Sequence, residues 1–221
     1  MNAKLIGLFS GFPDRRFPPA IADVLKAALP VRSSLVFISA WPADFERNDA
    51  DAAGMHGMFT AWNLGFRSFQ VIDDRTENEA AARLVREADC IFLMGGHATK
   101  QYELICQKKI DRELQRSTAV ILGVSAGSSN MAVRTLDIWE SHEPYSALGL
   151  TDFTVKAHVS PDDEALLQTL QEISAAYALP ICAMEDESAI FIKEDGVTCI
   201  GTIRLVSEGQ VRIFSPEQMN R

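Results

Sequence analysis

The sequence predicts an α/β fold: a three-layer sandwich with a mainly parallel central sheet flanked by helices, and antiparallel hairpins near the C-terminal end. Two observations support this prediction. Up to Ala132, short continuous apolar runs alternate with amphipathic stretches, as in a parallel sheet covered on both faces. After Ser188, short apolar runs are separated by glycine-containing turns, which is typical of hairpins. No linker, repeat or change of composition divides the chain, so we expect residues 1–221 to form a single domain.

Strands and helices alternate in the first part of the chain. Five apolar segments are predicted as strands: Leu5–Ser10, Ser34–Ser39, Phe69–Ile72, Cys90–Met94 and Ala119–Val124. Four stretches between them are predicted as helices: Pro19–Ala28, Asn48–Leu64, Glu77–Glu87 and Lys100–Gln115. Crossovers between parallel strands are right-handed, and ligands bind at the carboxyl ends of the strands. The positions of interest are therefore Ser10-Gly11, Ala40-Trp41, Gly95-Gly96 and Ser125.

The pattern changes after Ala132. A loop-rich stretch extends to about Leu150, and a short segment at Phe153–Val159 precedes a predicted helix at Asp163–Tyr177. The last part of the chain contains four short segments with turns that carry Gly196 and Gly209. These segments are Ala189–Lys193, Val197–Ile200, Arg204–Val206 and Val211–Phe214.

The most informative stretch is Gly123-Val124-Ser125-Ala126-Gly127, which follows the fifth predicted strand and precedes a run of small residues. A G-x-S-x-G nucleophile elbow requires this strand–turn–helix context. The two glycines allow close approach of strand and helix, and the strained turn exposes the serine hydroxyl. We therefore predict Ser125 as a catalytic nucleophile, with the backbone N–H of Ala126 facing a developing oxyanion.

A nucleophilic serine needs a base, and the chain has four histidines. His158 lies where a short extended segment gives way to a helix, so its ring can project over a neighbouring strand end. We predict it as the general base. His142, in a loop with Glu143 and Pro144, is the alternative.

The base in turn needs an orienting carboxylate. Asp137 and Glu140 both lie between Ser125 and His158 in the chain, which gives the order serine, acid, histidine. A second oxyanion donor is expected from the Gly95-Gly96 pair at the end of the fourth strand, where glycines expose backbone N–H groups.

Composition excludes several classes of function. The net charge is −9 with no basic run, which argues against a nucleic-acid or membrane-surface partner. The Gly95-Gly96 turn does not form a nucleotide-binding fingerprint, so a nucleotide site is not indicated. The cysteines (Cys90, Cys106, Cys182 and Cys199) have no C-x-x-C or zinc-ligand spacing, so we expect reduced thiols and no metal site. We find no signal segment or membrane span, and therefore expect a cytoplasmic protein.

Four stretches of the chain together resemble the serine-peptidase family of peptidase E (aspartyl dipeptidase) and cyanophycinase. They are Ser10-Gly11-Phe12, Gly95-Gly96 with Thr99 and Gln101, the G-V-S-A-G-S-S segment, and His158 with Pro161-Asp162. The resemblance implies a fold similar to class I glutamine amidotransferase domains. It also implies hydrolysis of a short peptide without metal or cofactor, by a serine exopeptidase or dipeptidase. Ser125 is then the nucleophile, His158 the base and Asp137, rather than Glu140, the acid, with Gly96 and Ala126 supplying the oxyanion-hole amides.

Specificity is less well defined by the sequence. His97 stands where members of this family often have a third glycine and an asparagine, so it is a candidate substrate contact. An aspartyl preference would need a cation, for which Arg134, Lys156 and Lys100 are candidates. Glu185, in the cluster Glu185-Asp186-Glu187, is a candidate for binding a substrate α-amine.

Two alternatives to a peptidase stay open from the sequence. One is an esterase or amidase that uses the same elbow on other acyl substrates. The other is a catalytically silent amidotransferase-like domain that binds a small molecule or partner. A homodimer also stays open as the assembly.

Overall fold

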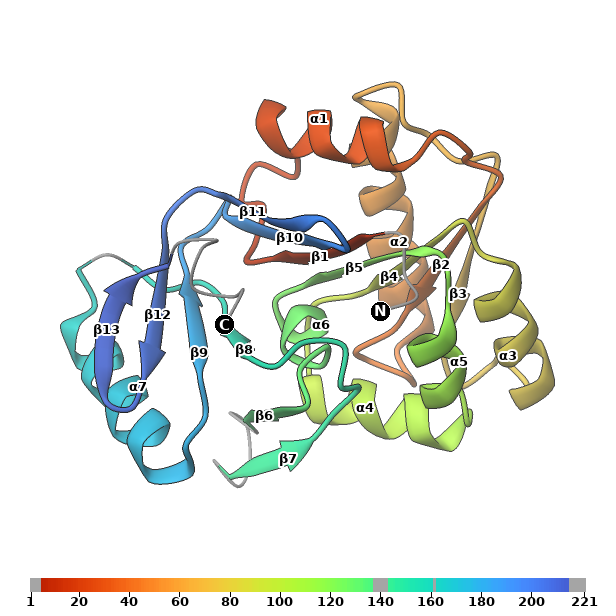
Figure 1. The fold of residues 1–221 in the computed structure, drawn as a ribbon. Helices are drawn as coiled ribbons and strands as arrows, with labels where there is room; N and C mark the ends of the chain where they lie inside the picture. Colours follow the sequence, from red (N-terminus) through yellow and green to blue (C-terminus); the bar gives the residue numbers. More distant parts are fainter. Residues whose placement is uncertain (1–4, 137–142, 161, 215–221) are drawn as a thin grey trace.

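A seven-stranded mixed sheet forms the centre of the protein in the computed structural model, which describes residues 5–136, 143–160 and 162–214 (Figure 1). Its strand order is β11-β10-β1-β5-β4-β2-β3. The strands are β1 (Leu5–Phe9), β2 (Ser34–Ile38), β3 (Ser68–Ile72), β4 (Cys90–Leu93), β5 (Val120–Val124), β10 (Ala189–Lys193) and β11 (Gly196–Ile200). Strands β1 to β5 are mutually parallel, and β10 pairs antiparallel with β1. The predicted fold class is confirmed.

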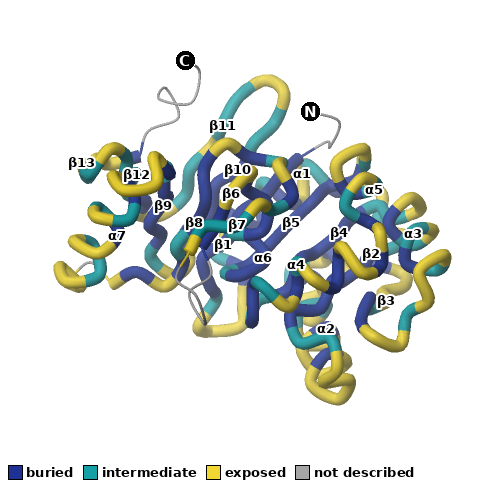
Figure 2. Tube along the Cα trace, turned by 90° about the horizontal axis from the view of Figure 1, so that it is seen from below, coloured by how far each residue is buried: buried dark blue, intermediate teal, exposed yellow. Residues whose placement is uncertain are grey.

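Helices cover both faces of this sheet, and the strands between them are buried (Figure 2). The helices are α1 (Pro19–Ala28), α2 (Phe45–Thr60), α3 (Asn78–Glu87), α4 (Ala98–Gln107) and α5 (Asp111–Arg116). One face is aromatic: Phe9, Phe37 and Phe92 pack against α1 and α2. The other face is aliphatic, and residues such as Ile91 and Ile121 pack against α3, α4 and α5. Because each strand is covered on both sides, its sequence is apolar throughout.

The structure divides the predicted helix Lys100–Gln115 into two. Helix α4 ends at Gln107, and Lys109 has a left-handed backbone with φ of 56°. The N–H of Ile110 then donates to the carbonyl of Ile105 at 3.1 Å, which closes the turn. Ile110 is fully buried, so the break keeps its side chain and that of Leu114 in the core.

A second sheet lies beside the first, with the strand order β13-β12-β9-β8. Its strands are β8 (Thr154–Lys156), β9 (Ile181–Met184), β12 (Ile203–Ser207) and β13 (Gln210–Ile213), and helix α7 (Glu164–Tyr177) packs on it through Leu170. The C-terminal hairpins are confirmed, although one belongs to each sheet. Strand β9 was not predicted, nor was the small ribbon of β6 (Arg134–Leu136) and β7 (Pro144–Ser146), where we expected a loop.

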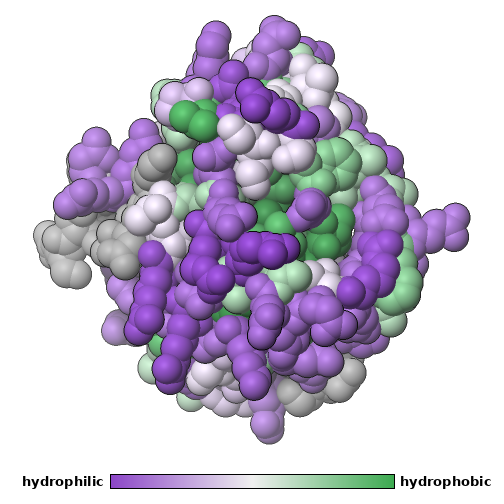
Figure 3. All heavy atoms as spheres, turned by 90° about the vertical axis from the view of Figure 1, so that its right-hand side faces the viewer, coloured by the Kyte–Doolittle hydropathy of each residue, from purple (hydrophilic) through white to green (hydrophobic). Residues whose placement is uncertain are grey.

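The surface on the β3 side of the molecule is mainly hydrophilic, with a smaller hydrophobic area near its centre (Figure 3). Phe69 of β3 is partly exposed and stacks on His56 of α2 at a centroid distance of 4.8 Å. Within the described ranges, no helix is long and apolar enough to cross a membrane.

The junction between β5 and the short helix α6 (Ala126–Ser129) is packed without space for an added side chain. A Cβ atom on Gly127 would collide with the backbone carbonyl of Leu93, and one on Gly123 would lie 2.7 Å from the backbone of Gly127. These glycines therefore allow α6 to approach β4 and β5 closely.

We predict that Gly127→Ala lowers the free energy of unfolding by about 1–3 kcal/mol or more, because backbone has to move to admit the methyl group. The control is Gly57→Ala in α2, where a Cβ atom meets nothing within 4 Å. That change should be neutral or stabilise the protein by up to about 1 kcal/mol, since alanine favours the helix. Urea denaturation measures both variants. Equal effects would contradict the close packing of the junction.

Candidate active site

Ser125 occupies the turn between β5 and α6, which is the strand–turn–helix context that its sequence predicts. Its backbone has φ of 51° and ψ of −111°, an unfavourable conformation for a residue with a side chain. The N–H of Ser125 donates to the carbonyl of Phe9 at 2.9 Å, which fixes the turn to the end of β1. The turn is therefore held in its strained form by the central strands.

A chain of two hydrogen bonds connects Ser125 to a histidine and a carboxylate. Ser125 Oγ lies 3.1 Å from Nε2 of His158, and Nδ1 of the same ring lies 2.7 Å from Oδ1 of Asp186. With its proton on Nδ1, the ring donates to Asp186 and accepts from the serine hydroxyl. The side chains of His158 and Asp186 are 52% and 37% exposed, so solvent and small molecules reach the site in this conformation.

The pairing of β8 with β9 brings His158 and Asp186 together. The two strands are parallel, with Lys156 opposite Ala183, and the N–H of Val159 donates to the carbonyl of Met184 at 3.0 Å. The segments that follow the two strands consequently run side by side, which places residue 158 next to residue 186.

Ser10, at the end of β1, joins these segments to the main sheet. Its fully buried hydroxyl accepts a hydrogen bond from the N–H of His158 at 2.8 Å and lies 3.1 Å from the carbonyl of Met184, to which it donates. Asp186 Oδ1 also lies 3.4 Å from the hydroxyl oxygen of Ser10. The backbone of Ser10 also fixes the loop that contains Asp186, because its N–H donates to the carbonyl of Ser188 at 3.2 Å.

Gly11 leaves the room that the histidine occupies. A Cβ atom at this position would collide with the imidazole ring of His158. The carbonyl of Gly11 accepts from the N–H of Glu187 at 2.8 Å, which anchors the loop that carries Asp186. The end of β1 thus contacts both partners of Ser125.

The predicted acid Asp137, its alternative Glu140 and the alternative base His142 lie outside the described residues. The structure instead brings Asp186 to the ring nitrogen at which we expected Asp137. Asp186 was not predicted because strand β9 was not predicted. The signal that could have identified Asp186 is the apolar run of β9, a fully buried strand that ends two residues before this carboxylate.

The predicted oxyanion-hole residues Gly96 and Ala126 line one cavity of about 300 Å³ together with Ser125 and His158. Gly96 has φ of 138°, and a Cβ atom there would collide with the indole nitrogen of Trp41. Glycine is therefore required both by the backbone conformation and by the contact with Trp41.

The structure does not bring the three predicted substrate contacts into this cavity. His97 is buried, and its Nδ1 accepts from the N–H of Lys100 at 3.4 Å, so it caps α4. Arg134 is exposed and donates to the carbonyl of Tyr177 at 3.3 Å. Glu185 forms an ion pair with Arg204 at 3.2 Å. Among the described residues, none of the three lines the cavity around Ser125.

Of the three candidate cations (Arg134, Lys156 and Lys100), Lys156 lines this cavity. Burial lowers the pKa of its ammonium group, and the negative charge of Asp163 partly offsets that effect. Lys100 lies elsewhere, with its ammonium group over the ring of Trp41, 5.4 Å from the centroid.

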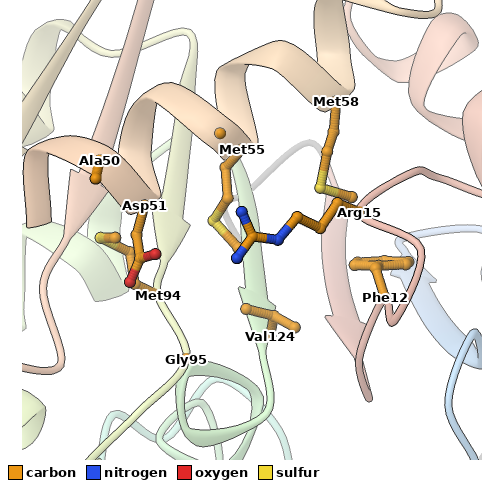
Figure 4. Close-up of a pocket in the computed structure, with 10 residues that line it drawn as sticks. Phe12, Arg15, Ala50, Asp51, Met55, Met58, Met94, Gly95 and Val124 are labelled. Carbon is orange, nitrogen blue, oxygen red and sulfur yellow. The ribbon is translucent and has the colours of Figure 1, made fainter. Parts of the chain in front are cut away.

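A second cavity, of about 220 Å³, adjoins the elbow on the side of α2 (Figure 4). Met55 and Met58 of α2 and Val124 of β5 form apolar walls, and the guanidinium group of Arg15 extends into the space between them. Gly95, which precedes the predicted oxyanion-hole residue Gly96, also lines it. Ser125 therefore lines the first cavity, and its neighbour Val124 lines the second.

No group of three or more His, Cys, Asp or Glu side chains suited to a metal ion occurs within residues 5–136, 143–160 and 162–214. The chemistry that these residues offer is attack by a serine hydroxyl, with proton transfer to a histidine held by a carboxylate.

Comparison with known proteins identifies a family. The model of peptidase family S51 matches residues 25–200. A peptidase from an acI-B1 Actinobacterium has a similar structure, with a TM-score of 0.69 and 16% sequence identity over 96% of this chain and 94% of that one. A protein from Listeria monocytogenes EGD-e that is described as peptidase E has a TM-score of 0.66 and 17% identity over 90% of this chain and 98% of that one. No curated protein matches the sequence.

Removal of the Ser10 hydroxyl tests the positioning of His158. We predict that Ser10→Ala slows covalent labelling of Ser125 by a fluorophosphonate roughly 10- to 100-fold, because the histidine segment loses a fixed acceptor. Ser174→Ala is the control, since it also removes one buried hydroxyl that bonds a carbonyl, that of Val206, but in α7. Its labelling rate should equal that of wild type. A rate in Ser10→Ala that matches the control would show that Ser10 does not position the histidine.

Proposed function

Because this chain belongs to peptidase family S51, we propose that it is a serine-type peptidase that hydrolyses short peptides, with Ser125, His158 and Asp186 as its catalytic residues. The observation that carries the proposal is the continuous hydrogen-bonded sequence of hydroxyl, imidazole and carboxylate, with separations of 3.1 Å and 2.7 Å. Such a sequence activates a hydroxyl that is unreactive at its ordinary pKa.

The reaction begins with attack of Ser125 Oγ on the carbonyl carbon of the scissile peptide bond. His158 Nε2 accepts the serine proton as the Oγ–C bond forms. Asp186 keeps the other ring proton on Nδ1 and stabilises the imidazolium that results. Negative charge develops on the carbonyl oxygen, and the N–H groups of Gly96 and Ala126 stabilise it.

Collapse of this intermediate breaks the C–N bond. His158 returns its proton to the leaving nitrogen, so the amine departs neutral and an acyl-enzyme is left on Ser125. Water then attacks the acyl carbonyl carbon and gives a proton to His158. The Oγ–C bond breaks as His158 returns that proton to Ser125 Oγ, and the acid product leaves. The exposed position of His158 allows this water to arrive without a conformational change.

Short peptides fit the dimensions of the site. The cavity that Ser125 lines and the one that its neighbour Val124 lines measure about 300 Å³ and 220 Å³, which is enough for small groups such as the residues of a short peptide. The similar structure from Listeria is described as peptidase E, which is consistent with an exopeptidase or dipeptidase.

An aspartyl preference is the specificity that the family resemblance implies, and Arg15 is the residue that would provide it. Its exposed side chain extends into the second cavity beside Gly95, and the rest of the lining of that cavity is apolar apart from Asp51 (Figure 4). A guanidinium group can bind a carboxylate through two parallel hydrogen bonds. We assign this cavity to the side chain of the residue that acylates Ser125.

The proposal is tested by intact-mass labelling with a fluorophosphonate. We expect one adduct per chain in the wild type, none in Ser125→Ala, and labelling slowed by at least about 1,000-fold in His158→Ala, since the hydroxyl then has no base. His56→Ala, which removes a histidine from α2, should label as the wild type does. A folded wild-type protein that stays unlabelled and cleaves none of a panel of dipeptides would contradict the proposal.

A further inference from the structure

Lys156 ends β8 and lines the cavity that contains Ser125 and His158. It is half-buried, and burial lowers the pKa of its ammonium group. In the part of the chain that the structure describes, it forms no ion pair with a carboxylate. The negative charge of Asp163 raises the pKa of Lys156 and so partly offsets the effect of burial. The carboxylate of Asp163 itself accepts a hydrogen bond from the N–H of Leu166 and caps α7.

A partly desolvated ammonium group that forms no ion pair with any described carboxylate is an unfavourable feature of a fold. A cation of this kind on the wall of a reaction cavity becomes favourable when a bound molecule supplies the opposite charge. Short peptides carry such a charge at every C-terminus, whatever their side chains are.

The position of Lys156 relative to His158 matches the size of one amino acid. A single residue separates them in the chain, so their backbones lie at most about 7 Å apart. His158 has to contact the leaving nitrogen in order to protonate it. When the leaving group is one amino acid, its carboxylate is attached to the same carbon as that nitrogen, and so lies within reach of Lys156.

We propose that Lys156 binds the free α-carboxylate of the leaving residue, so that the enzyme releases a single C-terminal residue from dipeptides and other short peptides. The inference rests on the proposed function. An aspartyl dipeptide has two carboxylates, and each of the two cavities would bind one of them. Arg15 contacts the side chain of the acyl residue, and Lys156 contacts the C-terminus of the leaving residue.

The other cations near the elbow do not take this role. Lys100 lies over Trp41 and lines a different cavity, with Pro42 and Glu103. Arg134 is directed to the end of α7, where it donates to the carbonyl of Tyr177. Lys100 therefore provides a matched control for removal of a lysine.

The test compares dipeptides of the form Xaa-Ala with their C-terminal amides, by the ratio of kcat/KM for acid over amide. For wild type we expect a ratio of roughly 10 to 100, as for a lost charge-assisted hydrogen bond. The ratio should fall to near one in Lys156→Met, be largely restored in Lys156→Arg and be unchanged in Lys100→Met. Intact-mass labelling by a fluorophosphonate, which has no carboxylate, should still give one adduct per chain in Lys156→Met, which would show that Ser125 stays reactive in this variant.

Two results would overturn the assignment while the proposed function stands. One is a wild-type protein that labels at Ser125 and cleaves acids and amides equally. The other is a Lys156→Met variant that keeps its preference for acids over amides but loses discrimination between Asp-Ala and Asn-Ala, because Lys156 would then read the side chain. A wild type that neither labels nor cleaves any of these peptides would overturn both proposals together.

Discussion

The hydroxyl of Ser10 is the interaction on which the geometry of the site depends. It is fully buried at the end of β1, where it accepts from the N–H of His158 and donates toward the carbonyl of Met184. The strand that carries it pairs with β5, which ends at Ser125. This hydroxyl therefore helps to connect the central sheet, which leads into Ser125, with the second sheet, which leads into His158 and Asp186. Because a buried hydroxyl is costly when it is unpaired, this arrangement is specific as well as stabilising.

Unfavourable backbone conformations occur in the segments that meet at Ser10 and Ser125. Ser125, His158 and Glu187 all have positive φ, at 51°, 59° and 62°. Each costs conformational free energy, which the surrounding hydrogen bonds offset. In return Ser125, His158 and Asp186 lie within hydrogen-bond distance of one another along a chain, beside a cavity that Ser125 and His158 line. In the proposed mode of binding, a peptide across the elbow would have Arg15 near one end and Lys156 near the other.

Much of the fold could be predicted because a covered parallel sheet leaves a clear pattern: β1 and β5 are continuous apolar runs, and the elbow follows the second of them. The acid could not be predicted in the same way. Asp137 and Glu140 both lie between Ser125 and His158 in the chain, and the family resemblance favours Asp137, but sequence order says little about which carboxylate approaches a ring. Asp186 reaches His158 through the pairing of β8 with β9, two strands of three and four residues that are separated by a helix. Strands so short carry too few residues to show a period, and their pairing is not local.

The most direct test of the central claim is proton NMR of the His158 ring at neutral pH, with Asp186→Asn and Asp137→Asn compared with wild type. The account predicts a low-field resonance from the proton on Nδ1, held in the hydrogen bond to Asp186. That resonance should be lost or strongly shifted in Asp186→Asn and unchanged in Asp137→Asn. A resonance that survives in Asp186→Asn and disappears in Asp137→Asn would show that Asp137 orients the base, and would contradict the arrangement on which the mechanism rests.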